Sequence, residues 1–241
     1  MKNYTLITGA TSGIGLATVQ RLAPDNKLII HGRCKSKLEE ISALLGSEHL
    51  VFHYDLNDLD TLGVVFSGFL KENNALVDKV IHCAGVDQTL PAKSLRANLI
   101  NDLMIVNFYS IVEIINVLLK RSVNKSSLKN VLFVSSISSI KGFKAKAAYS
   151  ASKAALDGYM RVLSKELAPT ATVNSVLPGA VPTAMSEAVF DSSVMVKHFE
   201  DIYPLGIGKV EQIVDVIVFY HNLEKPWITG QQIVIDGGMS S

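Results

Sequence analysis

The sequence predicts an α/β fold in which one doubly wound parallel sheet of about seven strands carries helices on both faces. Short strand-like runs alternate with longer helical patterns from one end of the chain to the other. Most of these runs are apolar throughout, as expected of parallel strands that are covered on both faces. No internal repeat, low-complexity tract or Pro/Gly-rich linker divides the chain, so residues 1–241 are expected to form a single domain.

Strand-like and helical segments follow one another in chain order. The expected strands are Tyr4–Ile7, Lys27–His31, Leu50–Tyr54, Lys79–Cys83, Asn130–Ser135, Thr172–Leu177 and Gln231–Ile235. The expected helices are Ile14–Leu22, Ser36–Leu45, Leu59–Lys71, Leu99–Arg121, Tyr149–Leu167 and Val210–Tyr220. Residues 186–204 fit this alternation poorly, yet they are too apolar for a disordered linker. We interpret this segment as a helical flap that covers a site.

Composition and charge exclude several classes of function. Lys and Arg number 23 against 22 Asp and Glu, a net charge of +1, which gives no global attraction to nucleic acid or to an anionic membrane. Polar residues interrupt the apolar stretch Leu99–Leu119, so no membrane span is expected there. Cys34 and Cys83 lack metal-ligand spacing, so no metal site is expected. With no signal-peptide core before the first strand, a cytoplasmic protein is expected.

A glycine-rich loop, Thr8-Gly9-Ala10-Thr11-Ser12-Gly13-Ile14-Gly15, connects the first strand to the first helix. Glycines here let the backbone approach a pyrophosphate, and the helix N-terminus offers N–H groups and a positive dipole end. A structural strand-to-helix turn is the alternative, but the position after the first strand favours a nucleotide site. The candidate contact residues are Gly9, Thr11, Ser12, Gly13, Ile14 and Gly15.

The segment after the second strand, His31-Gly32-Arg33-Cys34-Lys35, carries two bases and no acid. Dinucleotide enzymes often place an acid here to hold a ribose hydroxyl, or a base to hold a 2′-phosphate. Arg33 can receive a phosphate with two hydrogen bonds, and Lys35 can add a point charge. A solvated basic loop is the alternative.

Tyr149 and Lys153 stand four residues apart in a helical pattern, which places both side chains on one face. A tyrosine has a pKa of about 10 and is a poor acid or base at neutral pH. A nearby ammonium, joined by the positive charge of an oxidised nicotinamide, is expected to lower that pKa. Tyrosine–lysine pairs at this spacing also occur on ordinary helices, so the pair indicates a catalytic role only when the residues around it do so as well.

A serine cluster and one asparagine complete the candidate catalytic group. Ser136 follows the fifth strand, at the sheet edge where ligands bind, and its hydroxyl can donate to a substrate oxygen. The neighbouring serines Ser135, Ser138 and Ser139 compete for this role. Asn107 lies inside a helical pattern, where asparagine is neither a good helix former nor a usual core residue; a surface asparagine is the alternative.

The order of these motifs resembles the short-chain dehydrogenase/reductase family over nearly the whole chain, beginning with the TGxxxGxG element at residues 8–15. The resemblance implies a Rossmann-like NAD(P)-binding domain that moves a hydride between a nicotinamide and a carbonyl or alcohol. It implies that Tyr149 is the general acid/base, assisted by Lys153 and by Ser136, with Ser138 as the fallback. Asn107 would hold a water that links Lys153 to solvent.

The same resemblance implies the cofactor contacts. Arg33 after the second strand favours NADP(H), with NAD(H) as the alternative. Asp55-Leu56 would meet the adenine, and Cys83-Ala84-Gly85 would line the cofactor, although His82-Cys83 replaces the two asparagines usual in the family. His82 is interpreted as a satisfied strand residue. Contacts near the nicotinamide would come from Pro178, Gly179, Val181, Thr183, Tyr149 and Lys153.

The substrate is less well defined by sequence. The motifs are most similar to 3-oxoacyl-[acyl-carrier-protein] reductases, with a sugar or polyol oxidoreductase as the first alternative and a non-catalytic nucleotide sensor as another. Lys141, Lys144 and Lys146 lie between Ser136 and Tyr149 and are hypothesised to attract an anionic substrate or an acidic carrier protein; a solvated loop is the alternative. The resemblance also implies a homodimer or homotetramer.

Overall fold

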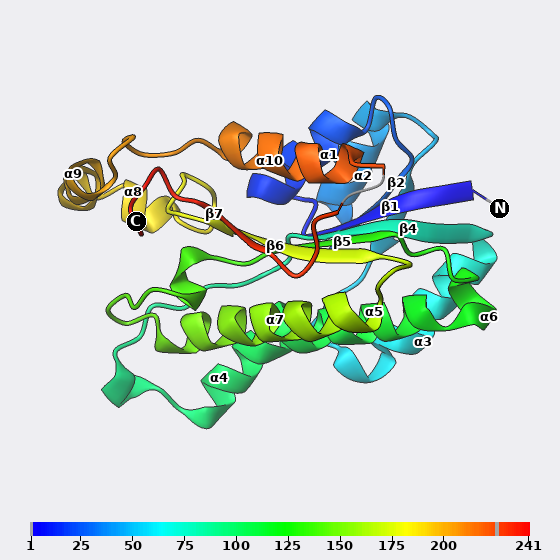
Figure 1. Ribbon diagram of the computed structural model, residues 1–241, viewed down its shortest axis with the longest axis horizontal. Coiled ribbons are helices and arrows are strands. Elements are labelled where there is room, and N and C mark those ends of the chain that lie inside the picture. The colour runs from blue at the N-terminus through cyan, green and yellow to red at the C-terminus, as the bar shows by residue number, and fades with distance from the viewer. Residues whose placement is uncertain (1, 225–226) are drawn as a thin grey trace.

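A computed structural model describes residues 2–224 and 227–241 and has the predicted parallel sheet (Figure 1). Seven strands lie in the order β3-β2-β1-β4-β5-β6-β7, and every neighbouring pair is parallel. The chain reverses its direction of travel across the sheet between β1 and β4, which is where such folds bind ligands. The strands are β1 Lys2–Thr8, β2 Leu28–Gly32, β3 Leu50–His53, β4 Ala75–His82, β5 Asn130–Val134, β6 Thr172–Pro178 and β7 Gln232–Ile235.

Helices cover both faces of the sheet (Figure 1). One face carries α1 Gly13–Leu22, α2 Lys35–Leu45 and α10 Val210–Asn222; the other carries α3 Leu59–Glu72, α5 Ser110–Leu119 and α7 Ala147–Glu166. Each layer has its own apolar core. Val19, Ile30 and Ile217 belong to the first, and Phe66 and Phe133 to the second. Burial on both faces explains why the strands are apolar throughout.

The predicted helix near Leu99–Arg121 is present as one helical stretch, Ala97–Leu119, but it is irregular and ends two residues earlier. The structure divides it into α4 Ala97–Met104, a π-helical turn η2 Ile105–Tyr109 and α5, followed by the separate short helix α6 Arg121–Asn124. π turns insert one extra residue per turn and are frequent at functional sites. By length and composition alone, Ala97–Leu119 could cross a membrane, but Ile111 and Ile114 of this stretch are buried in the core between helix and sheet.

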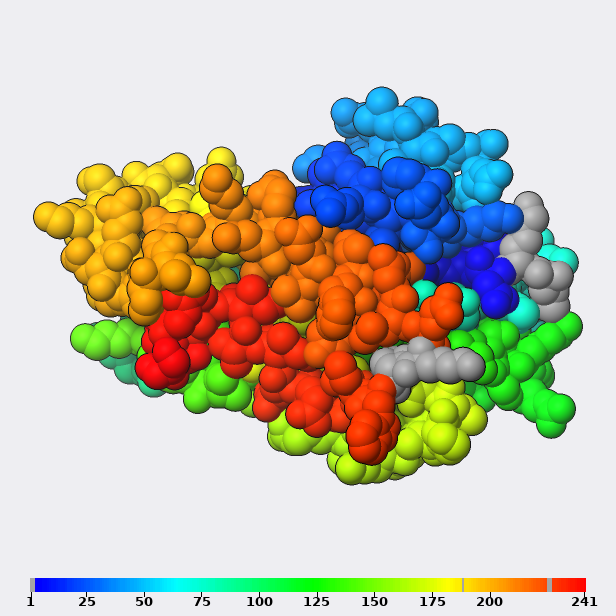
Figure 2. Space-filling model, turned by 45° about the horizontal axis from the view of Figure 1, so that its top comes forward, coloured from blue at the N-terminus to red at the C-terminus, as the bar shows by residue number. Residues whose placement is uncertain are grey.

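Short helices and the C-terminal segment close the carboxyl edge of the sheet. The remaining elements are η1 Ala92–Ser94, η3 Ile137–Ser139, α8 Glu187–Phe190 and α9 Ser193–Ile202. α8 and α9 lie beyond the carboxyl ends of the strands, so residues 186–204 are largely helical, as predicted (Figure 1). The C-terminal segment, red in Figure 2, packs beside α9 and the loop after it, where Leu205 N–H donates to Gly237 C=O at 3.1 Å.

Candidate active site

The glycine-rich loop leaves the end of β1 and turns tightly into α1. Gly9 has a φ of +67°, and a Cβ on it would lie 2.7 Å from the Ala84 backbone nitrogen. A Cβ on Gly15 would lie 2.2 Å from the Gly9 carbonyl oxygen, so only glycine fits there. Ser12 precedes α1 in extended conformation, no side chain caps the helix, and its first turn holds no acidic residue. This cradle of backbone amides fits a pyrophosphate.

The ends of β2 and β3 form the neighbouring part of the cradle. A Cβ on Gly32 would lie 2.6 Å from Thr11 Cγ2, so Thr11 packs against the residue that precedes the exposed Arg33. The pKa of Asp55 is lowered, chiefly by a hydrogen bond from Asn57 N–H and also by the positive charge of Arg33, which places Arg33 and Asp55 near each other. The Leu56 side chain is buried in the core, so it can offer only its backbone to a nucleotide.

The turn after β4 is joined to β1 by His82, one of the two residues that replace the family's asparagines. Its Nδ1 lies 2.8 Å from Thr8 Oγ1, which also accepts a hydrogen bond from Ala84 N–H. Burial lowers the pKa of His82 well below its usual range, so the imidazole is neutral and shares one hydrogen with the Thr8 hydroxyl. The prediction of a satisfied strand residue is half right, because Nε2 is buried and has no hydrogen-bond partner within residues 2–224 and 227–241. Burial raises the pKa of the adjacent Cys83 thiol to about 12, which makes it a poor nucleophile.

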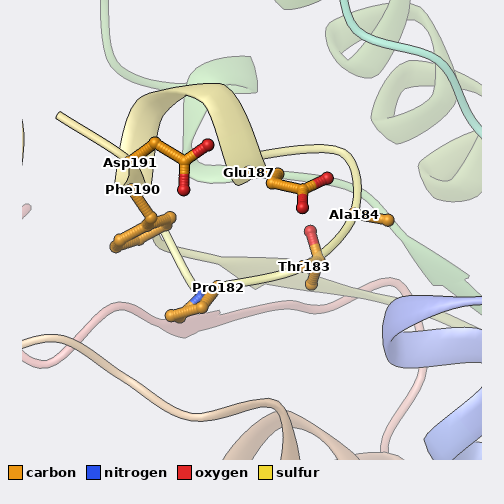
Figure 3. Close-up of a pocket in the computed structure, with 6 residues that line it drawn as sticks. All are labelled: Pro182, Thr183, Ala184, Glu187, Phe190 and Asp191. Atoms are coloured by element: carbon orange, nitrogen blue, oxygen red, sulfur yellow. The ribbon is translucent and has the colours of Figure 1, made fainter.

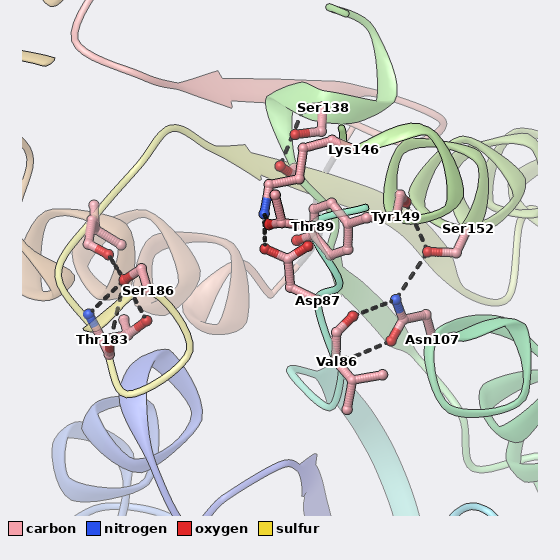
Figure 4. Close-up of polar contacts among 12 residues, drawn as sticks. Val86, Asp87, Thr89, Asn107, Ser138, Lys146, Tyr149, Ser152, Thr183 and Ser186 are labelled. Carbon is pink, nitrogen blue, oxygen red and sulfur yellow. Dashed lines mark hydrogen bonds and ion pairs between the residues drawn. The ribbon is translucent and has the colours of Figure 1, made fainter. Parts of the chain in front are cut away.

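Asn107 lies in the π turn and is fully buried, contrary to the surface alternative. Its Oδ1 accepts from Val86 N–H at 2.7 Å, and its Nδ2 donates to Val86 C=O and to Ser152 Oγ, both at 2.9 Å (Figure 4). Ser152 in turn donates to the Tyr149 carbonyl at 2.8 Å. The asparagine therefore links the turn after β4 to the first turns of α7. Ser152 was not singled out from the sequence, although it stands three residues after Tyr149.

Tyr149 and Lys153 lie on the same face of α7, as the spacing predicts. Lys153 Nζ lies 5.8 Å from the centre of the Tyr149 ring and donates to the Val134 carbonyl at 2.9 Å. A Cβ on Gly85 would lie 3.3 Å from Lys153 Nζ and 3.4 Å from Asn107 Oδ1, so both groups converge on this glycine. The fold therefore brings the lysine, the asparagine and the cofactor turn to one place.

The pKa of Tyr149 is shifted opposite to the expected direction. Burial raises it, the nearby Asp87 carboxylate raises it further, and a hydrogen bond with Ser136 acts in the other direction. Lys153 alone does not lower this pKa, because desolvation of the phenol outweighs an ammonium that points to a backbone carbonyl; the expectation that Lys153 and an oxidised nicotinamide together lower it stays a prediction. Burial also lowers the pKa of Lys153 to about 8, with partial compensation from Asp157 and other acidic groups.

Hydrogen bonds distinguish the four candidate serines. Ser136 Oγ accepts from Ser138 N–H at 3.1 Å and bonds to Tyr149, which leaves Ser136 beside the phenol. Ser135 donates instead to Asp157 Oδ2 at 3.0 Å, and Ser139 donates to the Ser136 carbonyl at 2.8 Å. Ser136 is therefore the serine positioned beside the predicted acid/base.

The turn after β6 holds the predicted nicotinamide contacts. Pro178 ends the strand, and a Cβ on Gly179 would lie 2.9 Å from the Tyr203 ring. Ser186 donates to the Val181 carbonyl at 2.7 Å and accepts from Thr183 N–H at 2.9 Å; it was not identified from the sequence. A pocket of about 450 Å³ opens beside this turn (Figure 3). It is lined by Pro182, Thr183, Ala184, Glu187, Phe190 and Asp191.

Two of the three lysines hypothesised to attract an anionic substrate or a carrier protein make contacts within the chain. Lys146 makes an ion pair with Asp87 and donates to Thr89 Oγ1 at 2.7 Å (Figure 4). Lys141 donates to the Met239 carbonyl at 2.8 Å. Within the described residues, only Lys144 of the three is left without a hydrogen bond or ion pair. Asp87, which neutralises Lys146, was not identified from the sequence.

Comparisons with known proteins cover almost the entire chain. The family model described as enoyl-(acyl carrier protein) reductase matches residues 9–240. The 3-oxoacyl-[acyl-carrier-protein] reductase FabG of Aquifex aeolicus (strain VF5) is 30% identical over 244 residues, which cover 98% of this chain and 96% of that protein. The glucose 1-dehydrogenase of Gluconobacter oxydans (strain 621H) is 28% identical over 246 residues, which cover 98% and 91%.

Solved structures share the fold along the full length. A 4-hydroxyisoleucine dehydrogenase complexed with NADH has a TM-score of 0.91 at 24% identity and covers 99% of both chains. ElxO with NADP bound has a TM-score of 0.87 at 22% identity, covering 100% of this chain and 99% of its own. These matches place the seven-stranded sheet and its helices among dehydrogenase folds.

Proposed function

The chain belongs to the short-chain dehydrogenase/reductase family of oxidoreductases, and we propose that it is an NADP(H)-preferring enzyme that interconverts a carbonyl and a secondary alcohol, with Tyr149 as the general acid/base. One observation carries the proposal. Ser136, Tyr149 and Lys153 converge with the buried Asn107 at the carboxyl edge of the sheet, beside the turn that follows β4. A protein that only sensed a nucleotide would have no use for this arrangement.

The residues divide the proton chemistry among themselves. Tyr149 donates a proton to the substrate oxygen during reduction, and Ser136 donates a hydrogen bond to the same oxygen as negative charge develops. Lys153 adds positive charge near the phenol, and Asn107 holds the surrounding backbone. Protonated Tyr149 serves reduction of a carbonyl, and its phenolate serves oxidation of an alcohol, so the same residue can work in either direction.

The cradle fits a nicotinamide dinucleotide, which supplies or accepts the hydride when bound. The loop from Gly9 to Gly15 would hold the pyrophosphate, and the turn around Val181 and Thr183 would hold the nicotinamide carboxamide. The exposed Arg33 supports a preference for NADP(H), because a guanidinium matches a 2′-phosphate. Lys35 lies 3.8 Å from Glu39 in an exposed pair, so it contributes less. NAD(H) remains the alternative.

Two substrate classes follow from the relatives. Several are 3-oxoacyl-[acyl-carrier-protein] reductases and one is a glucose 1-dehydrogenase, so a 3-oxoacyl thioester and a sugar or polyol are both candidates. Asp87 neutralises only Lys146, whereas Lys141 bonds to an uncharged carbonyl, so Lys141 and Lys144 keep positive charge and a carrier-protein-linked substrate stays among the candidates. We also propose self-association through α5 and α7, where Leu119 and Val162 are exposed.

The test is a panel of carbonyls and alcohols, with NADPH and NADH, followed by absorbance at 340 nm. Wild type should turn over at least one member, and Tyr149→Phe should abolish that turnover while it still binds the cofactor. Arg33→Ala should lower the NADPH/NADH ratio of kcat/KM by about ten-fold, equivalent to one charged hydrogen bond. The matched control Arg121→Ala, on the distant α6, should leave the ratio unchanged. Tight cofactor binding without turnover would indicate a sensor, and an unmoved ratio in Arg33→Ala would refute the cofactor preference.

A further inference from the structure

Asp87 lies two residues after Gly85 and projects to the same side as Tyr149 (Figure 4). Its carboxylate pairs with Lys146, whose Nζ lies 6.0 Å from the centre of the Tyr149 ring. The electrostatic influence of Asp87 on both Tyr149 and Lys153 also places it next to the proposed chemistry. The proposed reaction gives this carboxylate no role.

The backbone around Asp87 is held firmly. Asn107 bonds to both backbone groups of Val86, the residue directly before Asp87, and the same amide connects through Ser152 to Tyr149. Lys146 supplies a second anchor, because it binds Asp87 and Thr89 together. Side chains that are fixed in this way can discriminate between ligands, since little conformational freedom is lost on binding.

One oxygen of this carboxylate is unused. Lys146 bonds to Oδ2, whereas Oδ1 is buried and has no hydrogen-bond partner among the described residues. The neighbouring Gln88 also has a buried, unpaired Oε1. Leaving a buried acceptor without a hydrogen bond costs about 1–3 kcal/mol. Each such atom beside an active site is therefore a candidate to accept a hydrogen bond from a bound ligand.

We propose that Asp87 Oδ1 is a substrate-binding acceptor that selects compounds with a hydroxyl group close to the reacting carbon, as in hydroxyketones, sugars and polyols. The inference rests on the proposed function and chooses between its substrate classes. A hydroxyl group donates one hydrogen bond and carries no charge. A plain acyl chain would bury Oδ1 without a partner, and an anionic group would be repelled by Asp87. A substrate ammonium would meet the positive charges of Lys146 and Lys153.

The test compares 3-hydroxy-2-butanone with 2-butanone, which share a carbon skeleton and differ by one hydroxyl, in NADPH-dependent reduction. Wild type should have the higher kcat/KM for the hydroxyketone. In Asp87→Asn, the amide oxygen turns toward Lys146 and an NH₂ group takes the place of Oδ1. This group cannot accept the hydrogen of the substrate hydroxyl and offers only a neutral hydrogen bond to its oxygen, which is about half as strong as one to a charged acceptor. The preference for the hydroxyketone should therefore fall by about three- to ten-fold.

Controls establish that a loss of preference in Asp87→Asn comes from the Asp87 side chain and not from misfolding or from a general loss of surface charge. Asp60→Asn changes an exposed carboxylate on α3 and should retain the wild-type preference. The thermal midpoint and the NADPH affinity of Asp87→Asn establish that the variant folds. A 3-amino-2-butanone arm tests for an ammonium, and a preference for it over the hydroxyketone would overturn the proposal.

Two further outcomes separate the inference from the proposed function. If 2-butanone is reduced but the hydroxyl gives no advantage, or if Asp87→Asn keeps the wild-type preference, the inference fails and the proposed function stands. If no carbonyl in the wider panel is reduced, the proposed function fails and this inference falls with it.

Discussion

The side chain of Asn107 hydrogen-bonds to both backbone groups of Val86: Oδ1 accepts from Val86 N–H at 2.7 Å, and Nδ2 donates to Val86 C=O at 2.9 Å. The two residues belong to different layers, since Asn107 lies in the π turn of a helix and Val86 follows the cofactor turn after β4. The second hydrogen of the amide goes to Ser152 and so reaches Tyr149. The asparagine therefore positions the cofactor turn and the proposed acid/base relative to each other.

Asn107→Ala should lower both stability and activity. It leaves two part-buried backbone groups of Val86 without their partner, at about 0.5–1.5 kcal/mol each, so the free energy of unfolding in urea should fall by about 1–3 kcal/mol. The kcat should fall more than KM changes, because the proposed acid/base is displaced. Asn116→Ala, at an exposed position of α5, should change stability by less than about 0.5 kcal/mol. Equal effects in the two variants would contradict the positioning role.

The strands and the main helices could be predicted, because the periodicity of apolar residues and the glycines of the loops are local signals. The π turn could not, since apolar residues continue through Ile105 and Val106 without a break in pattern. The family resemblance selected Ser136, but the contact that engages Ser135, its hydrogen bond to Asp157 of α7, could not be predicted. Such pairings are tertiary, and no local pattern reveals them.

The electrostatics of the site were missed for the same reason. Asp87 and Lys146 are 59 residues apart in sequence and meet only where the loop after β4 reaches the N-terminal end of α7. From the sequence, Lys146 is one of three similar lysines, and nothing marks it as neutralised. The raised pKa of Tyr149 in the chain alone was therefore not foreseen, since its burial and the Asp87 carboxylate could not be seen from the sequence.

Gly15→Ala should impair nucleotide binding. The new Cβ would lie 2.2 Å from the Gly9 carbonyl oxygen, and the loop must shift to relieve that contact. We expect the NADPH Kd to rise at least ten-fold and the thermal midpoint to fall. Gly68→Ala is the matched control, because its Cβ meets nothing within 4 Å and it lies inside α3. There the change should stabilise the helix by about 0.5–1 kcal/mol and leave Kd unaltered. An intact Kd in Gly15→Ala would contradict the assigned cradle.

Asp87→Asn should move the pH profile of alcohol oxidation to lower pH. Oxidation uses the deprotonated form of Tyr149, so kcat/KM rises as pH passes the tyrosine pKa. The Asp87 carboxylate raises that pKa, and its removal should lower it. Lys146, Lys153 and Ser136 also face the phenol and remain in place. The readout is kcat/KM against pH for the best alcohol substrate, with Asp60→Asn as reference. An unchanged pH profile, or one shifted to higher pH, would contradict the electrostatic effect of Asp87 on Tyr149.

Acidification should destabilise the protein through its buried histidines. His31 lies at the end of β2, where its Nε2–H donates to Tyr54 C=O at 3.2 Å and its Nδ1 accepts from Gly9 N–H at 3.5 Å. Burial lowers its pKa from 6.5 to about 4. The unfolded chain binds this proton near pH 6.5 and the folded chain only near pH 4, so stability is full above pH 6.5 and falls between those values. His82, whose pKa is also lowered by burial, adds to the effect.

His31→Gln isolates the contribution of one histidine to this acid sensitivity. The free energy of unfolding, measured in urea at pH 7 and at pH 4.5, should fall by about 2–3 kcal/mol less in the variant than in wild type. A purely structural effect of the substitution would lower stability equally at both pH values and leave this difference unchanged. His198→Gln, at an exposed position of α9, should keep the wild-type difference. If His31→Gln loses as much unfolding free energy between pH 7 and pH 4.5 as wild type does, the imidazole already carries a proton in the folded chain. A doubly protonated imidazole has no acceptor, so the hydrogen bond from Gly9 N–H to Nδ1 cannot then exist.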